Sequence, residues 1–194
     1  MQAFSVRSFA DVWVAGRPLS SRFAREVSLV VAGTILLALC AQIRNPLIPV
    51  PATLQTFAVL LIGATFGARR AAITTLAYLA EGAVGLPVFA GFGAGIVKLV
   101  GPTAGYLWSF PIAAFVVGFL MERGCDRRFL TALPALLVGD VLILLAGFAW
   151  LAAAIGPQAA WSTGVAPFIL FNALKIALVA TAIPIARRRV NKLT

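Results

Sequence analysis

The sequence predicts an all-α membrane protein whose six transmembrane helices pack into one compact bundle. Hydrophobic residues fill 61% of the 194 positions and charged residues only 11%, whereas a soluble domain is about 45–50% apolar and about 25% charged. At about 20 apolar residues for each span, this length holds roughly six spans with short connections. Basic turns also alternate with apolar links along the chain, which indicates an even number of spans.

Six apolar stretches supply these spans. Their expected boundaries are Val27–Ile43, Thr53–Phe66, Ala71–Val84, Ala104–Met121, Leu133–Ile155 and Val165–Ala186. The second and third are short for a hydrocarbon core of about 30 Å, so we expect them to extend into their flanking loops. Residues 1–26 form a cytoplasmic N-terminal tail, either a short surface helix or a loose segment, residues 27–186 the substrate-binding membrane domain, and residues 187–194 a basic cytoplasmic tail.

The basic residues set the expected topology. Thirteen of the 16 lie in the two tails and in the turns at 69–70 and 123–128, whereas the opposite side holds only Arg44 and Lys98. Because Lys and Arg are enriched in cytoplasmic loops, both termini are predicted in the cytoplasm. The net charge of +10 therefore reflects membrane topology and not a nucleic-acid partner.

The three outer links are apolar and rich in Pro and Gly. They span Asn45–Pro51, Gly85–Gly105 and Gly156–Gly164. Irregular backbone at membrane depth is tolerated only where it is buried in protein or lines a cavity. We therefore expect these links to cap a substrate pocket that opens outward, although the third also fits an ordinary tight connection.

Polar residues inside the expected spans are candidates for binding, because such residues usually face a cavity or one another. Lys175 lies near the middle of the sixth span and suits the counter-charge of an anionic ligand. Asn172 lies on the same helical face, three residues earlier, and fits either the pocket or an interhelical hydrogen bond. Asp140 fits the pocket or a neighbouring helix equally well. Glu81 is expected to be wetted or to pair with Lys98.

Aromatic residues gather near the outer links. Phe89 lies within the broken segment at 85–107, as does Tyr106, and both suit the walls of a pocket for an apolar ring, whereas Trp161 suits an interfacial belt. The sequence contains no histidine and no P-loop motif, so ATP hydrolysis, a metal site, a cofactor and an intramembrane enzyme are not expected.

Several motifs together resemble one known family. They are PVPATLQTFAVLLIGATFGARRAA at 49–72, YLAEGAVGLPVFAG at 78–91, GPTAGY at 101–106, Trp150–Leu151, and Pro167, Phe168, Leu174 and Lys175. Over roughly residues 30–180 the chain is similar to the BioY family, the biotin-specific S components of energy-coupling factor (ECF) transporters.

The resemblance implies a protein of the bacterial inner (cytoplasmic) membrane that binds biotin near its outer face. It would deliver biotin to a transmembrane coupling protein (T component) and a pair of ABC ATPases, which alone use ATP. Two alternatives are a self-sufficient biotin transporter without ATPases and a small-molecule transporter for a different vitamin.

The chain departs from the family pattern at two places. Asn172 stands where relatives usually carry Asp, and Asp140 stands in the fifth span where relatives often carry Asn. The A-x-x-x-A pattern that S components present to the coupling protein is also not literal. Small residues of the first span offer a similar close-packing face; they are Gly33, Thr34, Ala38 and Ala41.

Biotin combines an apolar thiophane ring, a neutral ureido group and a carboxylate. We expect Lys175 to meet the carboxylate or to position Asn172 at the ureido group, with Lys98 as the rival for the carboxylate. Candidates for the ureido ring are Asn172, Asp140 and Gln55, and the expected walls are Phe89, Tyr106 and Trp150.

Overall fold

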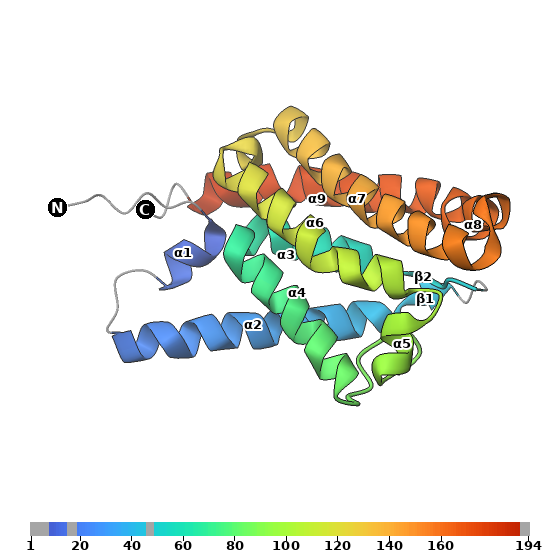
Figure 1. Ribbon diagram of the computed structural model, residues 1–194. Coiled ribbons are helices and arrows are strands. Elements are labelled where there is room, and N and C mark those ends of the chain that lie inside the picture. The colour runs from blue at the N-terminus through green and yellow to red at the C-terminus, as the bar shows by residue number, and fades with distance from the viewer. Residues whose placement is uncertain (1–7, 15–18, 46–48, 191–194) are drawn as a thin grey trace.

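The computed structural model describes residues 8–14, 19–45 and 49–190 and is mostly helical (Figure 1). Its long helices lie side by side in one bundle; they are α2 (Leu19–Gln42), α3 (Gln55–Phe66), α4 (Ala68–Ala83), α6 (Ala104–Glu122), α7 (Phe129–Ile155) and α9 (Ala166–Val190). Shorter elements complete the chain: α1 (Phe9–Val14), β1 (Arg44–Asn45), β2 (Ala52–Thr53), α5 (Ile96–Val100), the 3₁₀ helix η1 (Cys125–Arg127) and α8 (Pro157–Gly164).

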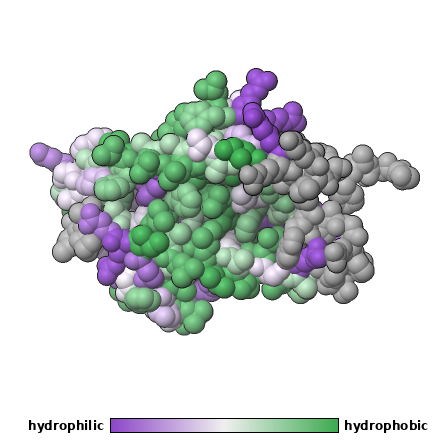
Figure 2. Space-filling model, turned by 180° about the vertical axis from the view of Figure 1, so that it is seen from behind, coloured by the Kyte–Doolittle hydropathy of each residue, from purple (hydrophilic) through white to green (hydrophobic). Residues whose placement is uncertain are grey.

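Each expected span contains one of the long helices, and most boundaries agree within about one helical turn. The exception is α2, which begins at Leu19, inside the segment expected to be a tail. Four segments are long and apolar enough to cross a membrane; they are Arg22–Gln42, Ala104–Glu122, Phe129–Ile155 and Pro157–Arg188. The helices α3 and α4 are shorter, at 12 and 16 residues. Seen from behind, the middle of the molecule is broadly apolar and its hydrophilic residues lie toward the two ends (Figure 2).

The third outer link is not irregular. Gly156 adopts a φ of 84°, and Pro157 then opens the eight-residue helix α8. Proline suits the first turn of a helix, because its missing N–H would have no partner there and its φ is already helical. The expected break is therefore a short corner before a further helix.

The helix α6 runs through the centre of the bundle, directly against α3 and α4. Two glycines permit this contact. A Cβ atom at Gly63 would lie 2.9 Å from the carbonyl oxygen of Ala114, and one at Gly118 would lie 2.5 Å from the backbone nitrogen of Ala68. Helices approach this closely only where a small residue leaves room for the neighbouring backbone.

A cluster of charged side chains ties α1 to the same end of the bundle. Arg70 donates two hydrogen bonds of 2.7 Å to the carboxylate of Glu26 and a third, also 2.7 Å, to Asp11. Burial tends to raise the pKa of the Asp11 carboxyl, but hydrogen bonds from Arg70 and Ser8 outweigh this and lower that pKa. The N-terminal tail thus includes a helix that ion pairs attach to the membrane domain.

Arg70→Ala tests this attachment, because it breaks the bonds to Glu26 and Asp11 together. We expect the free energy of unfolding to fall by about 1–2 kcal/mol, since all three side chains are partly exposed and solvent screens them. The measurement is thermal unfolding of the purified protein in detergent. Arg69→Ala is the matched control, because Arg69 is the exposed neighbour. Equal losses in the two variants would show that the ion pairs do not hold α1.

Candidate functional site

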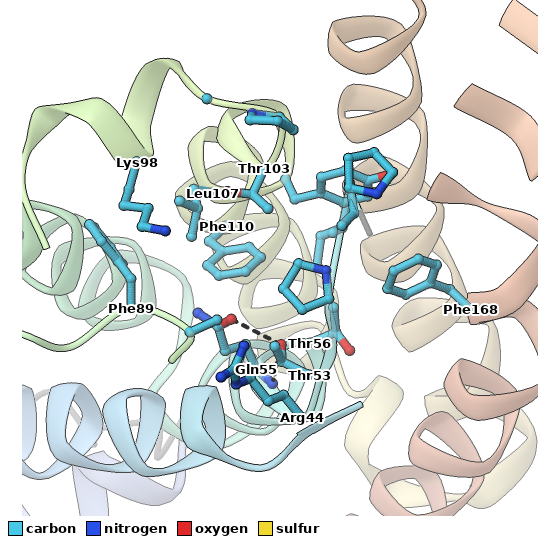
Figure 3. A pocket seen from close by; sticks show the side chains of 18 of the residues that line it. Arg44, Thr53, Gln55, Thr56, Phe89, Lys98, Thr103, Leu107, Phe110 and Phe168 are labelled. Carbon is cyan, nitrogen blue, oxygen red and sulfur yellow. Dashed lines mark hydrogen bonds between the residues drawn. The ribbon is translucent and has the colours of Figure 1, made fainter. Parts of the chain in front are cut away.

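A cavity of about 520 Å³ lies at the end of the bundle that carries the β1–β2 hairpin and α5 (Figure 3). The hairpin and residues of the first two outer links form one side, and side chains of the long helices form the rest; the third link, Gly156–Gly164, contributes no lining residue. Most of the lining is apolar, and a few polar groups converge on it, as in typical small-molecule sites. The residues used below are Arg44, Thr53, Gln55, Thr56, Phe89, Lys98, Tyr106, Phe110, Phe168 and Asn172.

The ammonium group of Lys175 lies behind this lining. Its Nζ donates to the carbonyl oxygen of Thr53 at 2.7 Å, to the hydroxyl oxygen of Thr56 at 3.0 Å and to Oδ1 of Asn172 at 3.2 Å. An ammonium has three N–H donors, so these three bonds use all of them. Lys175 does not border the cavity; it binds α9 to the corner where β2 meets α3.

Asn172 borders the cavity and links Lys175 to Asp140. Its Nδ2 donates to Oδ1 of Asp140 on α7 at 2.7 Å. Asp140 is buried but does not line the cavity, so it supports Asn172 from behind. The structure therefore brings together the three residues expected in the fifth and sixth spans, and only the amide reaches the cavity wall.

Gln55 opens α3 beside β2 and is held from two sides. Its Nε2 donates to the hydroxyl of Tyr78 at 2.8 Å, and its Oε1 accepts a bond of 2.9 Å from the Thr53 hydroxyl. The Tyr78 hydroxyl in turn donates to the carbonyl oxygen of Val88 at 2.9 Å. These bonds hold the amide plane of Gln55 at the cavity wall.

The aromatic walls differ in part from those expected. Phe89 packs edge-on against Tyr78 at 5.5 Å between ring centroids, and Tyr106 stacks with Phe168 at 6.2 Å. The rings of Phe89, Tyr106 and Phe168 line the cavity, whereas Trp150 does not. The Trp150 indole instead donates to the carbonyl oxygen of Gly101 at 3.0 Å and anchors the second outer link.

Two cations stand at the cavity, Arg44 from β1 and Lys98 from α5 (Figure 3). Both pack against the turn at residues 89–93. A Cβ at Gly91 would lie 2.9 Å from the Arg44 guanidinium carbon, and one at Gly93 would lie 2.6 Å from Cε of Lys98. Of the two alternatives for Glu81, pairing with Lys98 is not the one observed, because the two residues form no ion pair and Lys98 lines the cavity.

Gln42, the last residue of α2, holds that turn in place. Its side-chain amide donates to the carbonyl oxygen of Phe89 at 3.1 Å and accepts from the backbone N–H of Phe92 at 3.0 Å. No local sequence pattern indicates these two hydrogen bonds of Gln42. Arg44, Thr56 and Phe110 were likewise not expected as lining residues, although Arg44 is one of only two basic residues on the expected outer side.

The small residues expected to meet a coupling protein face the bundle instead. Thr34 and Ala41 are buried, and a side chain at Gly33 would contact Phe66 of α3; Ala38 packs against the core from a half-buried position. In this arrangement the four residues form the contact of α2 with its own chain. The exposed face of α2 is a stripe of larger apolar residues that Ile43 continues just past the helix; within α2 they are Val27, Val31, Ile35 and Leu39.

In the described part of the chain, no group of three or more Cys, Asp or Glu side chains lies together to hold a metal ion. What the cavity offers chemically is binding. It presents aromatic walls, two amides with fixed orientations and two cations, a set that suits an apolar ligand carrying a neutral polar group and an anionic group.

Comparison with known proteins places the chain in a family. The model of the BioY family matches residues 10–192. A probable biotin transporter BioY of Pyrococcus horikoshii is 45% identical over 85% of this chain and 96% of its own. The biotin transporter BioY of Thermotoga maritima is 38% identical over 78% of this chain and 90% of its own.

A solved structure also shares the fold. The crystal structure of an S-component for biotin from an ECF-type ABC transporter aligns with a TM-score of 0.78 and 22% identity, covering 89% of this chain and 95% of that one. The family match and the close relatives together span most of the sequence. The chain is therefore a multi-pass membrane protein that belongs to the BioY family.

Proposed function

We propose that this chain is the biotin-binding S component of an ECF-type vitamin uptake system in the cytoplasmic membrane. The observation that carries the proposal is the cavity, in which amide, cationic and aromatic groups match the three chemical parts of biotin. The BioY family match and relatives named as biotin transporters support the same substrate.

The proposed contacts with biotin use the polar groups at the cavity that still have a free hydrogen-bonding position or charge. All three N–H groups of Lys175 already donate hydrogen bonds to the protein. Arg44 and Lys98 are therefore the proposed partners of the biotin carboxylate. Asn172 and Gln55 would read the ureido group, and Phe89, Tyr106 and Phe168 would hold the thiophane ring. Lys175 and Asp140 act through Asn172, and Trp150 acts through the second outer link.

The same proposal includes six spans with both termini in the cytoplasm. Support comes from the ends of the bundle, because α1, η1 and the start of α4 lie opposite the cavity (Figure 1). The basic residues beside these elements include Arg69, Arg123 and Arg128, as the positive-inside rule requires for a cytoplasmic face. The hairpin and α5 would then cap the cavity on the outer side.

Delivery would pass through a T component and a pair of ABC ATPases, since this chain carries no nucleotide-binding motif of its own. Biotin uptake by cells that contain this chain as their sole biotin transport protein separates this route from a self-sufficient transporter. We expect uptake only when the T component and the ATPases are expressed with it. Uptake by the chain alone would replace the S-component proposal with independent transport.

Biotin binding is the first test of the function. We expect isothermal titration of the purified protein in detergent to give a dissociation constant below micromolar for biotin, without ATP. Thiamin and pantothenate, vitamins with other shapes and charges, serve as control ligands and should not bind at that concentration. A protein that binds neither biotin nor any analogue this tightly would overturn the substrate assignment.

Arg44→Ala and Lys98→Ala test the carboxylate contact. Each should weaken biotin binding by about tenfold to hundredfold, the usual loss for a hydrogen bond to a charged group. Neither should weaken binding of biotin methyl ester, which lacks the negative charge. Arg69→Ala, far from the cavity, is the control for net charge. Unchanged biotin affinity in both variants would remove the two residues from the site.

Lys175→Met separates support from direct contact. If Lys175 only holds the β2–α3 corner and Asn172, the substitution should reduce binding of biotin and of its methyl ester by similar factors. Elution as a single species in detergent checks that the variant is folded. A loss confined to biotin would instead make Lys175 the partner of the carboxylate.

A further inference from the structure

We propose that Asp140 is a positioning residue, and that the order of acid and amide between α7 and α9 sets the hydrogen-bonding character of the cavity wall. An amide, Asn172, faces the cavity and the acid, Asp140, lies behind it. This inference rests on the proposed function, because it concerns how the same site selects the ureido group.

The orientation of the Asn172 amide follows from its neighbours. Lys175 is a pure donor, so the Asn172 atom 3.2 Å from its Nζ must be the carbonyl oxygen. The amide nitrogen then faces Asp140, whose carboxylate accepts from it at 2.7 Å. Turning the amide over would place its N–H groups against an ammonium and its oxygen against a carboxylate. Lys175 and Asp140 thus fix the amide from opposite sides.

The three residues also balance charge across the amide. The buried cation of Lys175 and the carboxylate of Asp140 do not form a direct ion pair, and Asn172 bonds to both. One N–H of Asn172 is committed to Asp140, which leaves its second N–H for a ligand acceptor such as a ureido oxygen. The wall therefore presents a neutral group, although a cation and a carboxylate both bond to it from behind.

The acid at position 140 and the amide at position 172 can be exchanged by mutation. Exchanging the two side chains keeps one acid, one amide and one lysine, but it brings the carboxylate to the cavity and places the amide behind it. A carboxylate wall favours a cationic ligand, whereas an amide wall favours a neutral one. The ureido ring of biotin and its cyclic guanidine analogue 2-iminobiotin, a cation at neutral pH, differ in just this respect.

The experiment compares four proteins: the unchanged chain, D140N, N172D and the exchanged double variant. Each is titrated with biotin and with 2-iminobiotin, and its thermal unfolding is measured without ligand. D140N leaves the acceptor geometry but removes the charge that balances Lys175, so biotin affinity should fall by about tenfold to hundredfold. N172D places two acids next to each other, so its biotin affinity should fall by a similar factor.

The double variant gives the deciding result. We expect it to recover the melting temperature lost in the single variants, since neighbouring partners couple, and to shift the ratio of affinities toward 2-iminobiotin by about tenfold or more. A role in folding alone would restore stability without changing that ratio. D140L, which removes the acceptor as well, should lose more biotin affinity than D140N.

Two outcomes would overturn the inference: D140N with unchanged biotin affinity, or a double variant with the original ratio of affinities. Failure of the unchanged chain to bind biotin would instead contradict the proposed function. The unfolding measurements would still report on the pair in that case, and single losses that simply add in the double variant would rule out the coupling.

Discussion

The site depends on one buried ammonium group. Removing a charged amine from water costs several kcal/mol, and the protein tolerates it only where hydrogen bonds replace the lost water. Lys175 satisfies this with three oxygen atoms from β2, α3 and α9. Because one acceptor is the backbone of Thr53, the same bond fixes the start of α3, where Gln55 lies. From Gln55 the hydrogen bonds continue through Tyr78 to Val88 and so to the wall that carries Phe89. A single cation thereby aligns segments from the beginning, middle and end of the chain.

The two ends of the bundle are built differently, and the difference suits their roles. Opposite the cavity, Arg70 and the close contacts at Gly63 and Gly118 hold the helices directly against one another. At the cavity, short elements and glycine-containing turns replace helix-to-helix contact. The turn at 89–93 includes Gly91 and Phe92, both with positive φ, which lets the backbone pass close to Arg44. Rigid packing at one end thus supports a small-molecule site made from irregular backbone at the other.

The helices of this fold could be predicted from sequence, whereas their rotations could not. Long apolar stretches bounded by Arg, Gly and Pro mark where helices begin and end, so the expected spans coincide with α3, α4, α6, α7 and α9. In α3 and α6, however, lipid-facing and core-facing residues are equally apolar, and periodicity does not distinguish the two faces. On α2, small residues suit close packing against a partner or against the chain's own helices; Gly33, Thr34 and Ala41 were expected at a partner surface and are buried within the bundle. Asn172 and Lys175 were linked correctly because three residues along one helix define a face without any tertiary information. The bonds from Lys175 to Thr53 and from Gln42 to Phe89 join distant segments, and no local pattern encodes them.

The number and strength of its contacts indicate which part of the site opens at the lowest free energy. The segment from Gly85 to Thr103, which includes α5, is largely exposed or half-buried and has two side chains in the core, Phe89 and Leu99. Single hydrogen bonds to its backbone also hold it, from Trp108 to Leu99, from Trp150 to Gly101 and from Gln42 to Phe89. Each such bond contributes about 1 kcal/mol net. Segments with few buried contacts open at lower free energy than a packed core. We therefore expect the exposed part of this segment, which carries Lys98, to open at lower free energy than the buried network around Asn172 and Gln55. A ligand that bridges Lys98 and Asn172 would join this segment to the buried network, so that binding would also stabilise the segment.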